Sequence, residues 1–194
     1  FHQIYTRAKN DYSGRVTVPV LWDKATESIV SNESSEIIRM FNGAFDDYCE
    51  VSEDYYPKHL REEIDTLNDR IYETLNNGVY LCGFATTQEA YDEIVIPLFS
   101  TLDWLEDILS SKRYLTGNKI TEADWRLFPT LIRFDSVYVS HFKCSKRRIK
   151  DYPNISRYMD QLIGISGIKE TINQETIMAH YFGSHKQLNP TGII

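Results

Sequence analysis

Residues 16–38 read VTVPVLWDKATESIVSNESSEII, and this stretch decides how the first part of the chain is expected to fold. Val, Thr and Pro alternate at its start and Leu-Trp follows, which predicts a strand over residues 16–22. A charged turn and a second short strand over residues 28–30 then complete a hairpin. Proline has no N–H for a sheet ladder, so Pro19 indicates an edge or a bend, and we expect a cis peptide bond before it.

A helix is expected directly after the hairpin. Residues 31–36 are rich in Ser, Asn and Glu, which favour helix starts, and apolar residues then recur with helical spacing. The pattern predicts a helix that starts near Glu33 and ends near Gly43. Two short strands and one helix do not make a stable domain alone, so this part is expected to be half of a larger one.

The hairpin and the helix start together suggest a binding site for a small peptide. The residue before a cis-proline, here Val18, directs its backbone N–H and C=O outward, where an extended peptide can pair with them. The helix N-terminus favours a carboxylate, and Ser34 adds a hydroxyl donor. The carboxylate of Glu33 is suited to an ammonium group. The alternative is that Glu33 and Ser34 only cap the helix.

From residue 58 onward, apolar residues recur every three or four positions, which predicts helices throughout. The Asn-Asn-Gly sequence at residues 76–78 is expected to end the first helix. Thr121 and Asp124 have the spacing of a capping box and mark the start of the third. The expected helices cover residues 58–75, 86–111, 121–134, 153–163 and 168–180.

These patterns predict an α+β fold that is mostly α. We expect a strand-and-helix part over residues 1–45, a linker over residues 46–57 and an all-helical domain over residues 58–194.

The composition of the chain argues against two kinds of binding partner, nucleic acid and membranes. The chain has 194 residues and a net charge of -7, which disfavours nucleic acid because phosphate neutralisation drives that binding. Three cysteines without a Cys-x-x-Cys pair indicate a reducing compartment, and we expect the cytoplasm. No apolar run approaches the roughly 20 residues of a membrane span, so no membrane partner is expected.

Two weaker signals have simple interpretations. The basic run over residues 143–150 could contact phosphate, but a solvated loop is favoured. His180 and His185 are five positions apart, which is poor spacing for one helix face, so no metal is expected.

Several stretches of the chain carry a family resemblance. A Val before the expected cis-proline, a hairpin and Glu-Ser at a helix start resemble the glutathione-binding half of a glutathione transferase. Five longer stretches resemble the xi class, the glutathionyl-hydroquinone reductases, and cover nearly the whole chain. They are VPVLWDKATESIVSNESSEIIRMFN, LNNGVYLCGFATTQEAYDE, RYLTGNKITEADWRLFPTLIRFDSVY, HFKCSKRRIKDYPN and HYFGSH.

The resemblance implies a fold and a reaction. Residues 1–45 correspond to the C-terminal half of a thioredoxin-like domain without its first strand, helix and second strand, and residues 58–194 to the all-α C-terminal domain of glutathione transferases. Family members attack the sulfur of an S-glutathionyl-hydroquinone with the thiolate of a Cys-Pro-Trp motif. Free hydroquinone leaves, and a second glutathione, the co-substrate, resolves the mixed disulfide. A homodimer is expected from the family.

The resemblance also implies site residues. Glutathione contacts carry over to the backbone of Val18 and to Glu33 and Ser34, and the catalytic tyrosines of the substrate pocket carry over to Tyr80 and Tyr181. A phenol can donate a hydrogen bond to the departing hydroquinone oxygen or stack on its ring. The alternative for any one of 13 tyrosines is ordinary packing.

The chain departs from the family in its nucleophile, because it contains no Cys-Pro-Trp. Cys49 is flanked by acids, Cys82 is expected to be a packing thiol, and basic neighbours are expected to lower the pKa of Cys144, whose sequence context in the family is structural. We therefore expect the nucleophile to lie before Phe1, in a longer protein, and this chain to be inactive alone. The alternatives are a non-enzymatic interaction domain with this fold or a conventional glutathione transferase.

Overall fold

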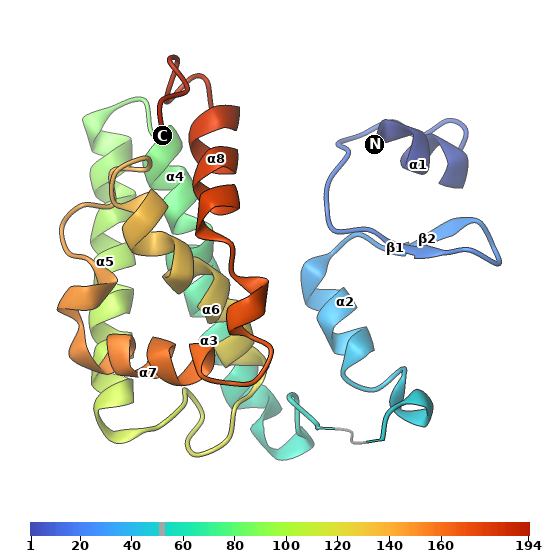
Figure 1. Cartoon of the computed structure of the whole chain (residues 1–194), viewed down its shortest axis with the longest axis horizontal. Coiled ribbons are helices and arrows are strands. Elements are labelled where there is room, and N and C mark those ends of the chain that lie inside the picture. Colours follow the sequence, from blue (N-terminus) through green and yellow to red (C-terminus); the bar gives the residue numbers. More distant parts are fainter. Residues whose placement is uncertain (51–52) are drawn as a thin grey trace. The chain divides into compact units, whose positions relative to one another are not determined.

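The computed structural model describes residues 1–50 and 53–194 and divides into two compact units, Phe1–Tyr56 and Pro57–Ile194 (Figure 1). Each unit is described by itself. The linker predicted over residues 46–57 includes Val51 and Ser52, which lie outside the described residues. Across the two described ranges, no helix combines the length and apolar character that a membrane span requires.

The first unit contains an antiparallel hairpin between two helices. Leu21 pairs with Ser31, Trp22 with Ile29 and Asp23 with Ser28, with an irregularity after Leu21. The elements are α1 (His2–Ala8), β1 (Leu21–Asp23), β2 (Ser28–Ser31), α2 (Ser34–Phe41) and the 3-10 turn η1 (Asp46–Tyr48). The predicted hairpin and the helix start near Glu33 are confirmed.

The predicted strand over residues 16–22 is wrong in its first part, since β1 begins only at Leu21. The peptide bond between Val18 and Pro19 is cis, as expected. The N–H and C=O of Thr17 are both bonded to the hydroxyl of Tyr5 rather than to a strand. Residues before Leu21 are therefore held by a side chain instead of a sheet ladder.

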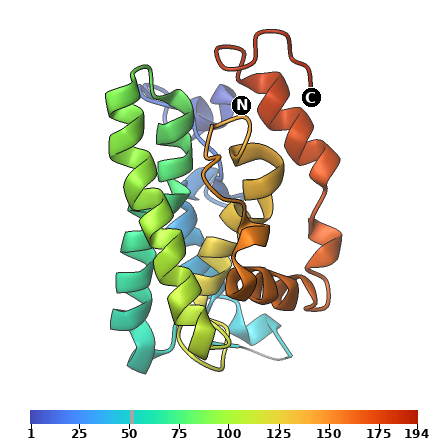
Figure 2. The ribbon, with the colours of Figure 1, turned by 90° about the vertical axis from the view of Figure 1, so that its left-hand side faces the viewer.

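The second unit is helical, with its core along the long helix α5. Helix α5 runs beside α4 and is crossed near its C-terminal end by α7 (Figures 1 and 2). The buried face of α5 includes Leu98, Phe99, Leu102 and Leu105, each with 0% exposure. The elements are η2 (Lys58–Leu60), α3 (Arg61–Ile71), η3 (Tyr72–Asn76), α4 (Gly78–Phe84), α5 (Gln88–Ser111), α6 (Glu122–Arg133), η4 (Phe134–Tyr138), η5 (Ile149–Asp151), α7 (Pro153–Ile163), η6 (Lys169–Thr171) and α8 (Gln174–Ser184).

The helix that was expected to stop at residues 76–78 continues into another helix. Helix α3 passes through a π-helical turn, η3, directly into α4, so the predicted stop is wrong. The side chain of Asn76 donates to the carbonyl of Arg126 and accepts from the hydroxyl of Thr130, both on α6. These tertiary bonds hold a sequence that usually ends helices in a helical conformation.

The capping box at the start of α6 is confirmed. The buried carboxylate of Asp124 accepts from the N–H and hydroxyl of Thr121, from the N–H of Leu115 at 3.0 Å and from the hydroxyl of Tyr158 at 2.9 Å. Burial raises the pKa of Asp124, while these four donors favour its charged form. This single side chain therefore joins the preceding loop, α6 and α7.

Candidate functional site

The first group of candidate site residues lies around the cis-proline of the first unit. Val18 is 73% exposed and precedes the cis bond. Glu33 occupies the N-cap position of α2 with an extended backbone, and Ser34 is the first helical residue. The side chain of Glu33 makes no capping hydrogen bond. Glu33 thus occupies the N-cap position, but its carboxylate does not bond to the helix N-terminus. The carboxylate is therefore suited to a ligand.

A hydrogen-bonded clamp holds the backbone just before Val18. The buried hydroxyl of Tyr5 donates to the carbonyl of Thr17 at 2.7 Å and accepts from the Thr17 N–H at 3.2 Å. The side chain of Asn32 donates to the Thr17 hydroxyl at 3.2 Å. The hydrogen bond with Thr17 lowers the pKa of Tyr5. Sequence patterns gave no signal for this clamp, because its members come from three separate segments.

The second group is a tyrosine cluster, formed by Tyr80 on α4, Tyr138 at the end of η4 and Tyr181 on α8. The hydroxyls of Tyr80 and Tyr181 lie 2.5 Å apart, and those of Tyr138 and Tyr181 lie 3.0 Å apart. The structure thus brings the two predicted tyrosines into direct contact. Tyr138 was missed by sequence reasoning, although it is the last residue of one of the stretches that carry the family resemblance.

Burial raises the pKa of two members of the tyrosine cluster, Tyr80 and Tyr138. Desolvation, followed by the hydrogen bond with Tyr181, raises the pKa of Tyr80 to about 12. Burial also raises the pKa of Tyr138, and the charge of Arg133 opposes the rise. Tyr80 is 36% exposed, whereas Tyr138 is 2% and Tyr181 7% exposed. At neutral pH, Tyr80 is therefore an accessible, protonated phenol backed by two buried ones.

Two π-helical turns place the rings of this cluster. The N–H of Asn77 bonds to the carbonyl of Tyr72 across η3, and the N–H of Val139 bonds to the carbonyl of Phe134 across η4. Each turn inserts one extra residue and so rotates the side chains that follow it. Tyr80 follows η3 closely, and Tyr138 ends η4. Single π-helical turns inside helices occur frequently at functional sites.

The two cysteines of the second unit, Cys82 and Cys144, do not resemble accessible nucleophiles. Cys82 and Cys144 are both fully buried, and the thiol of Cys144 donates to the carbonyl of Phe142 at 3.7 Å. The neighbouring Cys82 thiol and desolvation both raise the pKa of Cys144. The expectation that basic neighbours lower the pKa of Cys144 is therefore wrong. Cys49, in the first unit, is exposed and follows η1.

The histidines near the tyrosine cluster form a pair. His141 Nε2 and His185 Nδ1 lie 3.1 Å apart, and their rings stack with centroids 5.3 Å apart. In the described part of the chain, no group of three or more His, Cys, Asp or Glu side chains is placed to hold a metal ion.

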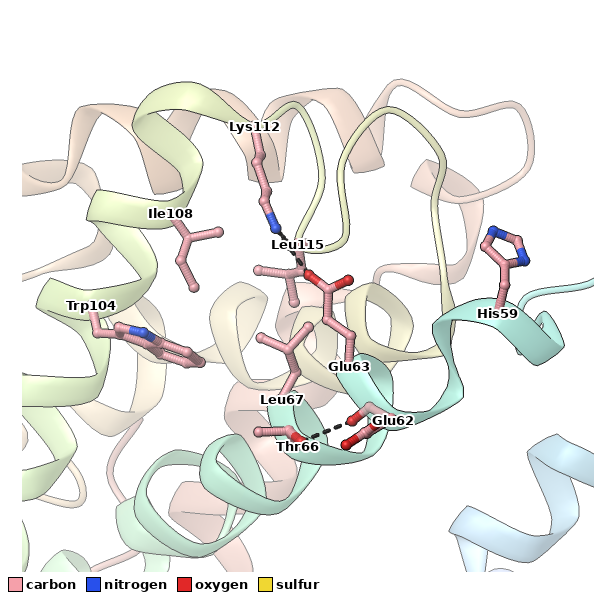
Figure 3. Close-up of a pocket in the computed structure, with 9 residues that line it drawn as sticks. All are labelled: His59, Glu62, Glu63, Thr66, Leu67, Trp104, Ile108, Lys112 and Leu115. Carbon is pink, nitrogen blue, oxygen red and sulfur yellow. Dashed lines mark hydrogen bonds and ion pairs between the residues drawn. The ribbon is translucent and has the colours of Figure 1, made fainter.

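A surface cavity of about 470 Å³ in the second unit lies between α3, α5 and the loop after α5 (Figure 3). Its side chains include Trp104, Leu67 and the ion pair of Glu63 and Lys112, whose oxygen and nitrogen lie 3.0 Å apart. Neither Tyr80 nor Tyr181 lines it. The tyrosine cluster carries an accessible phenol with a raised pKa, so we place the candidate chemistry there and not in this cavity.

Comparisons with known proteins agree with the family resemblance. Residues 88–161 match the family described as glutathione S-transferase, C-terminal domain. The crystal structure of glutathione transferase Xi 1 from Trametes versicolor has a TM-score of 0.95 and 53% identity, and covers 99% of this chain and 68% of that chain. The chain belongs to the xi class of glutathione transferases.

Two bacterial relatives are similar over the whole chain. Glutathionyl-hydroquinone reductase PcpF from Sphingobium chlorophenolicum is 58% identical over 193 residues, which are 100% of this chain and 62% of that protein. Glutathionyl-hydroquinone reductase YqjG from Escherichia coli is 59% identical, over 100% of this chain and 59% of that protein. The glutathione-bound structure of YqjG has a TM-score of 0.97 and covers 100% of this chain and 63% of that chain. The chain thus spans about three fifths of the curated relatives it matches.

Proposed function

We propose that the protein to which this chain belongs reduces S-glutathionyl-hydroquinones to hydroquinones, with glutathione as the reductant. The two bacterial relatives bear the name of this activity and align with the whole chain. The observation that carries the proposal is the tyrosine cluster, in which a protonated, accessible Tyr80 is hydrogen-bonded to a buried phenol. The names of these relatives do not favour the alternatives of a non-enzymatic domain or a conventional transferase.

The reaction consists of two exchanges at sulfur. A cysteine thiolate attacks the glutathione sulfur of the substrate, so that an S–S bond forms, the bond from sulfur to the ring breaks and the ring carbon takes up a proton. A second glutathione thiolate then attacks the mixed disulfide and releases glutathione disulfide and the enzyme thiolate. The substrate is reduced by two electrons, and two glutathione sulfurs are oxidised to one disulfide.

Tyr80 is proposed to act on the hydroquinone. Because its pKa is about 12, it is a hydrogen-bond donor at neutral pH and can stabilise charge that develops on the hydroquinone oxygen as the sulfur departs. Tyr181 is proposed to share this role through its 2.5 Å hydrogen bond with Tyr80. A preorganised donor of this kind contributes to catalysis because it requires no rearrangement during the reaction.

Glutathione is proposed to bind at the cis-proline of the first unit. The backbone of Val18 would pair with the peptide as a short strand, while Glu33 holds the ammonium group and Ser34 a carboxylate. Val18 is exposed, and the carboxylate of Glu33 makes no capping hydrogen bond to α2. Both observations support these roles. The glutathione-bound structure of a relative that aligns with the whole chain supports the ligand itself.

The nucleophile is proposed to be the thiol of a Cys-Pro-Trp motif, which this chain does not contain. The burial of Cys82 and Cys144 supports this, since a reactive thiol needs access to its substrate. The proposal extends to a homodimer and to a cytoplasmic location, which rest on the family resemblance and on cysteine usage.

The test is a steady-state assay of the complete protein with an S-glutathionyl-hydroquinone and glutathione, in which hydroquinone and glutathione disulfide are quantified by chromatography. We expect turnover, and a kcat that is lower by about 10²-fold in Tyr80→Phe, because one donor to the developing charge is lost. Tyr72→Phe, at an exposed tyrosine on η3, is the control and should turn over normally.

Absence of hydroquinone release by the complete protein would refute the proposed activity. Equal kcat values for Tyr80→Phe and the control would refute the role of Tyr80. The 194-residue chain alone should neither form a mixed disulfide with glutathione nor turn over, and thiol-dependent activity in this chain would contradict the assignment of the nucleophile.

A further inference from the structure

Phe142 is a fully buried ring that contacts every member of the tyrosine cluster. It stacks on Tyr138 with ring centroids 5.4 Å apart and an interplanar angle of 3°. Its centroid lies 5.1 Å from that of Tyr80 and 5.8 Å from that of Tyr181. Phe142 has no polar atom that could take part in the reaction, so any influence on the cluster must act through the positions of these three rings.

The Phe142 ring also lies against α4 at Gly83. A Cβ atom at Gly83 would lie 2.2 Å from Cδ1 and 2.5 Å from Cγ of Phe142, which is far inside van der Waals contact. Gly83 does not have a positive φ, so space and not backbone conformation requires glycine here. Glycine inside a helix is less favourable than alanine, because it loses more backbone entropy on folding. The missing side chain at Gly83 leaves a gap in the surface of α4, the notch at Gly83, which the Phe142 ring fills. Glycine at this position makes α4 less stable than alanine would.

The chain around Phe142 is held in place by backbone hydrogen bonds. After η4 the chain turns back, with the N–H of Cys144 bonded to the carbonyl of Tyr138 at 2.9 Å. Lys143 takes a left-handed conformation with φ 60, and its carbonyl accepts from the hydroxyl of Tyr91 on α5 at 2.5 Å. These bonds fix where the backbone presents Phe142, so the ring has little freedom to follow a displaced neighbour.

We propose that Phe142, seated in the notch at Gly83, is a positioning residue that sets the spacing of the hydroxyls in the tyrosine cluster. The ring is the wedge between α4, which carries Tyr80, and η4, which ends at Tyr138. Hydrogen bonds of 2.5 and 3.0 Å weaken steeply when the rings that hold the hydroxyls shift. The catalytic consequence rests on the proposed function, whereas the structural consequence does not.

Two substitutions disturb the Phe142 ring in different ways. Gly83→Ala pushes the ring out of its notch, and Phe142→Leu removes the flat surface on which Tyr138 stacks. Gly183→Ala is the matched control, because it makes the same change on α8, two residues after Tyr181, where a Cβ meets nothing within 4 Å. A purely structural role of Phe142 would lower stability in the first two variants without changing the hydroxyl hydrogen bonds.

The first measurement is the ¹³Cζ NMR spectrum of the complete protein with labelled tyrosine, since this carbon reports the hydrogen bonding of its hydroxyl. Signals of the cluster are assigned with Tyr80→Phe, Tyr138→Phe and Tyr181→Phe. Gly83→Ala and Phe142→Leu should both shift the cluster signals, and Gly183→Ala should leave them unchanged. Cluster signals that stay in place in folded Gly83→Ala and Phe142→Leu would overturn the proposal.

The second measurement is steady-state kinetics of the complete enzyme. Gly83→Ala should lower kcat by roughly 10- to 100-fold, the effect expected of a misplaced catalytic group, while the KM for glutathione stays unchanged. Shifted NMR signals with an unchanged kcat would overturn the positioning role. Lack of reductase activity in the wild-type protein would instead refute the proposed function. The NMR result would still decide whether Phe142 sets the spacing of the hydroxyls in the tyrosine cluster.

Discussion

The hydroxyl oxygens of Tyr80 and Tyr181 lie 2.5 Å apart, although the two residues are separated by 101 positions in the chain. Helices α4 and α8 carry them, and Tyr138 adds a second hydrogen bond to Tyr181 at 3.0 Å. Hydrogen bonds in a chain of phenols are stronger than isolated ones, because each hydrogen bond polarises the next. The arrangement makes Tyr80 the accessible end of a buried hydrogen-bonded chain.

Removing the hydroxyl of Tyr181 should change the acidity of Tyr80. The hydrogen bond and charge of Tyr181 both raise the pKa of Tyr80, so in Tyr181→Phe this pKa should fall from about 12 toward the ordinary value, while burial keeps it above that value. The measurement is the ionised fraction of Tyr80 at about pH 11, which its ¹³Cζ NMR signal reports. Tyr48→Phe, at an 88% exposed tyrosine, is the control. An unchanged titration of Tyr80 in Tyr181→Phe would show that the pair is not coupled.

The Tyr5 clamp should matter for glutathione affinity. Tyr5→Phe leaves the N–H and C=O of Thr17 without their partner and frees the backbone next to Val18. We expect the KM for glutathione of the complete enzyme to rise by roughly five- to tenfold, the value of about one hydrogen bond, with little change in kcat. Tyr48→Phe again serves as control. A fall in kcat at constant KM would contradict a role in positioning the binding backbone.

The buried capping carboxylate of Asp124 should dominate the stability of the second unit. Asp124→Asn changes an acceptor of four hydrogen bonds and should lower the free energy of unfolding by about 2–3 kcal/mol. Asp151→Asn is a matched control, because Asp151 forms a capping box on the exposed turn η5 and should cost less than about 1 kcal/mol. Urea denaturation measures both, and equal losses would contradict the importance of burial at Asp124.

The histidine pair should make stability depend on pH. Burial, His185 and Lys143 lower the pKa of His141, and burial and His180 lower that of His185. The unfolded chain therefore binds more protons than the folded chain as the pH falls below the ordinary histidine pKa of about 6.5, and the free energy of unfolding should decrease there. Above that pH both states hold neutral imidazoles, so this contribution should be flat.

The measurement is urea denaturation between about pH 5.5 and 7.5, a window above most carboxylate titrations. In the double variant His141→Gln and His185→Gln, the free energy of unfolding should decrease less at low pH than in the wild type. The control His2→Gln, at an exposed histidine, should show the full decrease. Identical pH profiles for the double variant and the wild type would rule out the histidine pair as the cause.

Local sequence signals were sufficient for several elements. Pro19 within an alternating apolar run predicted a bend with a cis bond, and the Ser, Asn and Glu residues before Ile37 predicted the start of α2. Thr121 and Asp124 predicted the capping box of α6. Each signal acts within a few residues, because backbone sterics and capping hydrogen bonds are local. The roles of Tyr80 and Tyr181 came from the family resemblance, since a tyrosine by itself predicts only packing.

Only the tertiary structure decided the features that depend on distant partners. Asn76 bonds to Arg126 and Thr130 on α6, which lie 50 and 54 positions further along the chain. These bonds keep the chain helical where its local sequence favours the end of a helix. Tyr138, the last residue of the π-helical turn η4, joins the tyrosine cluster through a hydrogen bond with Tyr181, which lies 43 positions further along the chain. Gly83 is required by the ring of Phe142 and not by its own backbone conformation. By itself, the sequence determined the cis-proline bend and the starts of α2 and α6, whereas the packing of distant segments determined which side chains meet, because those contacts exist only once the chain has folded.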